Sequence, residues 1–149
     1  MRALRQWYPA VIWAAAIWLF SMASFSARST SHIILPVLHW LLPWASREAL
    51  DLVPFLIRKS AHFVEFFIFS LLVLPGIRGE RPGWKLAWGV AAVLIAACCA
   101  ALDEFHQSLV PGRMASPMDS LLDTCGAAAA PLLAWLRMRW RSGHSRTPA

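Results

Sequence analysis

Ionisable side chains suited to proton transfer or ligand binding occur in three short stretches of the sequence. His62 and Glu65 are three residues apart, so on a helix they are neighbours on one surface. Asp103, His106 and Gln107 fall at i, i+3 and i+4, and they also share one helix face. Each stretch therefore presents an imidazole and an acid in the same direction.

The third stretch runs from Asp119 through Asp123 to Gly126, with the spacing i, i+4 and i+7. Gly126 and Ala130 form a pair of small residues four apart near the same face, and such pairs let a second helix approach closely. We therefore expect the face with the two aspartates to pack inward against another helix.

These residue types define the chemistry that we expect. Acids and histidines that share one cavity can act as general acids and bases, with Glu65 as the deepest candidate. The candidate catalytic residues are His62, Glu65, Asp103 and Glu104. The candidate substrate-binding residues are Lys59, His106, Gln107, Arg113, Ser116, Asp119 and Asp123. The sequence contains no HExxH or comparable ligand motif, so we predict no metal site, and we leave any cofactor open.

Composition indicates that a membrane surrounds these residues. The chain is 58% hydrophobic and 15% charged, and its apolar residues come in long blocks. It contains nine tryptophans, a residue enriched where membrane meets water. The net charge is +6, but the basic residues flank the apolar blocks, which indicates contact with anionic lipid and not with nucleic acid. We therefore predict an all-α, polytopic membrane protein.

The apolar blocks predict four transmembrane helices, at about residues 8–25, 58–77, 84–102 and 119–136. The first block could also be a secretory signal, but its length and the three later blocks favour a retained helix. Residues 33–44, interrupted by Pro36 and Pro43, are expected to be interfacial or re-entrant. Ser46 then resembles the N-cap of a short amphipathic helix. Residues 103–117 are expected to form a polar loop. The predicted membrane domain is 1–136, and 137–149 is predicted to be a disordered basic tail.

The distribution of Lys and Arg predicts the orientation. With a cytoplasmic N-terminus, nine of the fourteen lie inside and five outside, as the positive-inside rule requires. The inner nine are Arg2, Arg5, Arg78, Arg81, Lys85, Arg137, Arg139, Arg141 and Arg146; the outer five are Arg28, Arg47, Arg58, Lys59 and Arg113. Both termini are thus expected in the cytoplasm, and all three polar stretches at the outer face of the membrane.

Two motifs resemble the VanZ-like family of membrane proteins, named for an accessory protein of glycopeptide resistance that is linked to teicoplanin. Residues 59–66, KSAHFVEF, are similar to the family pattern K-x-x-H-F-x-E-Y. Residues 103–126 are similar to D-E-x-x-Q…P-G-R-x-x-S-x-x-D…N-x-x-G. Phe66 stands where tyrosine is common and Asp123 where asparagine is common. The resemblance implies a four-helix membrane protein of the cell envelope, and it implies no particular reaction.

Three interpretations remain open. The polar residues could form an outward-facing site that binds or acts on an envelope lipid, a lipid-linked substrate or a glycopeptide-type molecule. They could belong to a small lipid or solute binder or transporter component, which would need a homo-oligomer because four helices make a thin wall. They could also be structural, because buried polar pairs can fix the register of helices. Whether the protein is an enzyme stays open.

Overall fold

A computed structural model describes residues 2–22, 27–111 and 115–144. Within these ranges the chain forms five α-helices and no strand, which confirms the all-α class. The helices are α1 (Arg2–Phe20), α2 (Ala27–Leu41), α3 (Arg47–Arg78), α4 (Leu86–Leu109) and α5 (Pro117–His144).

Helix α3 is the longest, with 32 residues, and it corrects one prediction. The side chain of Ser46 accepts a hydrogen bond from the Ala49 amide, so the predicted N-cap is confirmed. The amphipathic helix that begins there does not end before the membrane span, because both belong to one helix that continues through Pro54. A proline removes only one hydrogen bond of the helical ladder, and here Pro54 is buried together with Leu50.

Three other predicted boundaries also move. Helix α3 passes Pro75 and ends at Gly79, whose φ of 61° is typical of glycine, and whose amide donates to the Pro75 carbonyl. Helix α4 continues to Leu109, so the acids predicted at the start of a loop lie on the helix itself. Helix α5 continues to His144, so the prediction that disorder begins at residue 137 is wrong.

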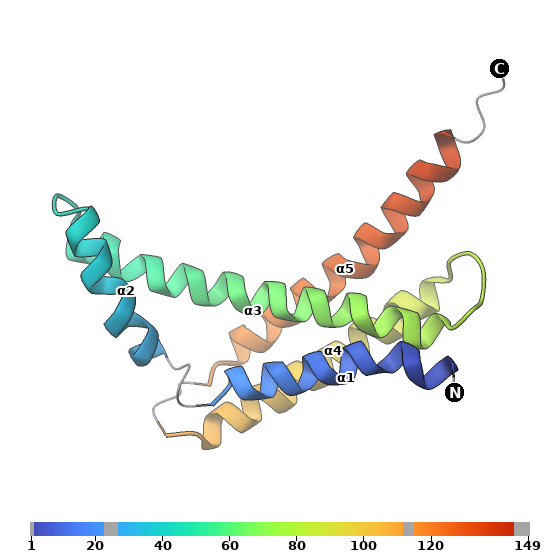
Figure 1. Ribbon diagram of the computed structural model, residues 1–149, viewed down its shortest axis with the longest axis horizontal. Coiled ribbons are helices and arrows are strands. Elements are labelled where there is room, and N and C mark those ends of the chain that lie inside the picture. The colour runs from blue at the N-terminus through green and yellow to red at the C-terminus, as the bar shows by residue number, and fades with distance from the viewer. Residues whose placement is uncertain (1, 23–26, 112–114, 145–149) are drawn as a thin grey trace.

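Helices α1, α3, α4 and α5 form a bundle, and α2 packs against the first part of α3, away from α1 and α4 (Figure 1). Helix α5 crosses α3 and extends beyond the bundle toward the C-terminus (Figure 1). In the core, α4 contributes the fully buried Ala92, Ala96 and Ala100, which recur every four residues along one face. Phe66 of α3 and Ala127 of α5 pack against this narrow face, so the helices can approach closely.

Two of the described helices, α3 and α4, are long and apolar enough to cross a membrane. Four spans therefore stay a prediction, since α5 carries two aspartates and a proline, and α1 begins with two arginines. The outer surface of the bundle is nevertheless apolar. Ile12 of α1, Leu94 of α4 and Leu132 of α5 are each more than half exposed. Large apolar surfaces of this kind mark contact with lipid or with another protein.

Candidate functional site

The bundle contains a concentration of buried polar side chains at the level where α3 enters it and where α4 ends. Six of the predicted site residues are less than a tenth exposed, and Lys59 lies at their edge, part-buried. We call these seven residues the polar site: Lys59, His62, Asp103, Glu104, Gln107, Asp119 and Asp123. They come from α3, α4 and α5, and all of them lie within turns of helix that face one another.

Helices α3 and α5 meet through two charged pairs in parallel register. Lys59 forms a hydrogen-bonded ion pair with Asp119, whose side chain is 2% exposed. One turn further along both helices, His62 Nδ1 lies 3.3 Å from Asp123 Oδ1, outside hydrogen-bond geometry. This contact becomes an ion pair when the imidazole is protonated.

Gly126 explains how the two helices come so close. A Cβ atom placed on Gly126 would lie 2.2 Å from the main-chain oxygen of Phe63. Only a residue without a side chain fits against this carbonyl. Asp119, Asp123 and Gly126 therefore form one packed face, and Ala130 is also fully buried, which confirms the packing predicted from their spacing.

On the other side of the site, α4 is tied to α1. Gln107 Nε2 donates to Asp103 Oδ2 at 2.7 Å, one turn apart on α4. The Ser21 hydroxyl donates to the other Asp103 oxygen and lies 3.4 Å from Gln107 Nε2. His106 stacks on Trp18, with ring centroids 3.9 Å apart. Helix α1, with the Ser21 that follows it, therefore covers the α4 side of the site.

Ser21 was not among the site residues predicted from the sequence. It lies near the end of the predicted first span, and the predicted topology put that end at the outer face with the other polar residues. Its hydroxyl group at that level is the feature of the sequence that could have indicated a place in the site. A single serine at the end of an apolar helix is common, so nothing in its type distinguishes it.

Glu104 reaches across to the start of α5. Its Oε2 accepts a hydrogen bond of 2.6 Å from the backbone amide of Ser116, which was predicted to bind substrate. Electrostatic interactions also link Glu104 to His62, Asp103 and Asp123. These contacts bring the acids of α4 and α5 into one region.

Glu65 is less buried than the acids of the polar site. The side chain of Glu65 is half-buried, so the expectation that it is the deepest acid is wrong. Its main-chain carbonyl accepts a bond of 2.9 Å from the Trp13 indole, and its charge interacts with His62. Arg113 lies outside the described residues, so its expected pairing with an acid of the site stays a prediction.

Several buried polar atoms of the site have no hydrogen-bond partner among the described residues. They include both carboxylate oxygens of Asp123, Oε1 of Glu104 and Nδ1 of His62. A buried polar atom without a partner costs about 1–3 kcal/mol, and more when it is charged. Carboxylate oxygens accept hydrogen bonds, so the site presents acceptors to a group that donates. Within the described chain, no group of three or more His, Cys, Asp and Glu is arranged to hold a metal ion.

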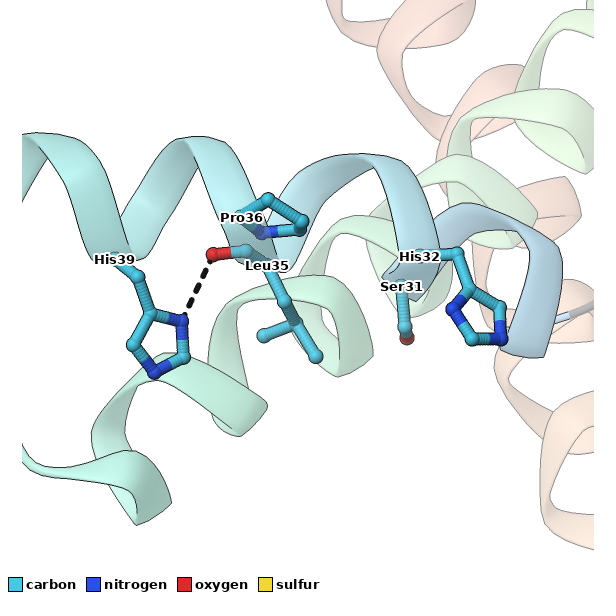
Figure 2. A pocket seen from close by; sticks show the side chains of 5 residues that line it. All are labelled: Ser31, His32, Leu35, Pro36 and His39. Atoms are coloured by element: carbon cyan, nitrogen blue, oxygen red, sulfur yellow. Dashed lines mark hydrogen bonds between the residues drawn. The ribbon is translucent and has the colours of Figure 1, made fainter.

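A separate surface hollow, of about 390 Å³, lies on α2 (Figure 2). His32 and His39 line it from opposite ends, and Pro36 lies between them along the helix. His39 Nδ1 is bound to its own helix, 2.9 Å from the Leu35 carbonyl, so this nitrogen carries the proton. All five lining residues come from α2, and none belongs to the polar site.

The fold and the site together define an α-helical membrane protein with a buried, acid-rich polar site between its helices. The family model described as VanZ/LLP1 matches residues 7–138, which include nearly all of α1 to α5. The chain belongs to this family, as its two motifs indicated. No curated protein and no solved structure matched the chain.

Proposed function

We propose that this VanZ-family protein binds a molecule of the bacterial cell envelope in its polar site, either a lipid head group or a glycopeptide-type molecule. One observation carries the proposal: buried carboxylate oxygens of Asp123 and Glu104 have no hydrogen-bond partner among the described residues. A ligand with hydroxyl, amide or ammonium donors would satisfy them.

The identity of residue 123 narrows the ligand class. The family pattern that this chain resembles has asparagine at this position, whereas this chain carries an aspartate. With Lys59 paired to Asp119, three further buried acids, Asp103, Glu104 and Asp123, share the region with one imidazole, that of His62. The site should therefore prefer a ligand with a positively charged donor, such as an amino sugar or an ethanolamine head group.

A second candidate function, acid–base catalysis, is supported by the arrangement of His62. Its Nδ1 faces the carboxylate of Asp123 at 3.3 Å, which leaves Nε2 as the nitrogen that could take a proton from a substrate hydroxyl. A carboxylate beside one nitrogen orients the ring and stabilises the imidazolium that forms, as in the Ser-His-Asp triad. In this mechanism Asp123 is a positioning residue.

Binding and product formation can be measured together on purified protein in nanodiscs, with teicoplanin and a panel of envelope lipids as probes. For a binder, Glu104→Gln should lower affinity about tenfold, the effect of losing one charge-assisted hydrogen bond. For an enzyme, His62→Gln should abolish product while affinity changes little. Glu48→Gln, an exposed acid at the start of α3, is the matched control.

The outcomes separate binder, enzyme and scaffold. If no probe binds, or if Glu104→Gln lowers stability without changing affinity, the polar site only holds the helices together. Loss of affinity without any product supports a binder. Product that persists in His62→Gln removes this histidine from the mechanism.

We also propose that α1 and α5 cross the bacterial cytoplasmic membrane together with α3 and α4, with both termini in the cytoplasm. The positive-inside distribution and the exposed apolar surfaces support this. In a cysteine-free background, Glu80→Cys should be labelled only from the inside and Val110→Cys from the outside. The reverse pattern would place the polar site at the inner face. A homo-oligomer is part of the transporter alternative, and cross-linking in membranes tests it.

A further inference from the structure

A second candidate site lies at the other end of the bundle, on its lipid-facing side. Helices α4 and α5 form a groove of about 550 Å³, whose lining includes Trp84, Gly89, Val93, Ala128, Pro131 and Trp135. We call it the α4–α5 groove. None of its lining residues is charged.

Small residues create the groove. Gly89 has no side chain, and a Cβ placed there would lie 3.2 Å from Pro131 Cβ and from the Trp84 ring. Ala128 adds little bulk on the facing helix. A strip of apolar surface therefore lies between the two helices, and it forms a hollow in which a hydrocarbon chain could lie.

Two cations lie near the end of the groove that is formed by Trp84 and Trp135. Lys85 follows the lining residue Trp84, and its Nζ lies 5.7 Å from the centroid of Trp88, a ring that does not line the groove. The Arg139 guanidinium lies 5.2 Å from the centroid of Trp135, which lines the groove. The cation–π contact of Arg139 therefore holds its charge beside a lining ring, at a level where Trp is favoured in membranes, and Lys85 lies at the same end of the groove.

We propose that the α4–α5 groove binds an anionic phospholipid, with one acyl chain along the apolar lining and the phosphate against Arg139, where Lys85 could turn from Trp88 to reach it. Basic pockets between membrane helices recognise anionic head groups in this way. A second copy of this protein fits the groove less well, because it would bring further cations to the end of the groove where Arg139 already lies.

This site is independent of the proposed function. About 25 Å of helix separates Leu86 from Asp103, from 17 residues at 1.5 Å each. The lipid would therefore belong to the membrane leaflet opposite the polar site.

Native mass spectrometry of the purified protein tests the proposal, with equimolar phosphatidylglycerol and phosphatidylcholine of identical chains. We expect phosphatidylglycerol adducts to dominate in the unmodified protein. In the double variant Lys85→Gln, Arg139→Gln this preference should fall at least about tenfold, since each basic residue near the phosphate contributes about 1 kcal/mol. The double variant Arg5→Gln, Arg47→Gln loses the same charge away from the groove and should keep the preference.

A second arm tests the groove itself. Ala128→Leu fills the lining and should lower adducts of both lipids, whereas Ala87→Leu, on an exposed position outside the groove, should not. No preference for phosphatidylglycerol, or equal losses in both double variants, would overturn the proposal. A dimer that Ala128→Leu dissociates would show that a second copy occupies the groove, and would also overturn it.

Discussion

The close contact at Gly126 makes a quantitative prediction about how α3 and α5 are held together. In Gly126→Ala the new methyl group would lie 2.2 Å from the Phe63 carbonyl oxygen, whereas real Cβ atoms essentially never come within 3.0 Å of another heavy atom. The carbonyl belongs to the α3 main chain and cannot turn aside. The two helices must therefore separate by about 1 Å at this point, a shift typical of an overpacked core.

The cost can be compared with a matched substitution on α4. Overpacking costs about 1–3 kcal/mol, and contact with main chain places Gly126→Ala at the upper end of that range. The better helix propensity of alanine offsets about 1 kcal/mol, so we expect a net loss of about 2 kcal/mol. In Gly89→Ala the methyl group meets side-chain atoms at 3.2 Å, which can yield, so this variant should remain within about 1 kcal/mol of the unmodified protein.

Unfolding by a titration of sodium dodecyl sulfate into mild detergent, followed by tryptophan fluorescence, measures both variants. We also expect Gly126→Ala to weaken ligand binding in the polar site, because Asp123 lies less than one turn before Gly126 and would move away from His62. Equal stability of Gly126→Ala and Gly89→Ala would refute the close approach of α3 and α5, and with it the geometry of the polar site.

Two further predictions use the same titration. Ser21→Ala removes a donor to the buried Asp103 carboxylate and should cost about 1.5–3 kcal/mol, whereas Ser108→Ala, an exposed donor to its own helix, should cost less than about 0.5 kcal/mol. Lys59→Met leaves the buried carboxylate of Asp119 without its cation and should cost about 3–5 kcal/mol, most of which a second change, Asp119→Asn, should restore.

Each of these has a clear contrary result. If Ser21→Ala and Ser108→Ala are equally stable, the hydrogen bond between Ser21 and Asp103 does not stabilise the packing of α1 against α4. If Asp119→Asn fails to rescue Lys59→Met, the lysine stabilises the fold through other contacts, such as its packing over the Phe55 ring.

Much of the fold and part of the site could be predicted from the order of the residues alone. The composition and the long apolar blocks indicated a helical membrane protein, and two gapped motifs indicated the family that the family model confirms. Helical spacing also predicted which face of α5 is buried. This worked because the 3.6-residue period relates positions on one helix to one direction, whatever the partner helix is.

Helix ends and pairings could not be predicted in the same way. Pro54 and the acids after Leu102 are usual signs of a helix end, yet α3 and α4 continue through them because neighbouring helices bury and pair these residues. Spacing within a helix says nothing about the rotation of one helix against another. Only the packed bundle decided that Asp119 pairs with Lys59, that Asp123 meets His62, and that Ser21 closes the site onto Asp103. These contacts join residues 60 or more positions apart, and the two between α3 and α5 depend on the close approach that Gly126 allows.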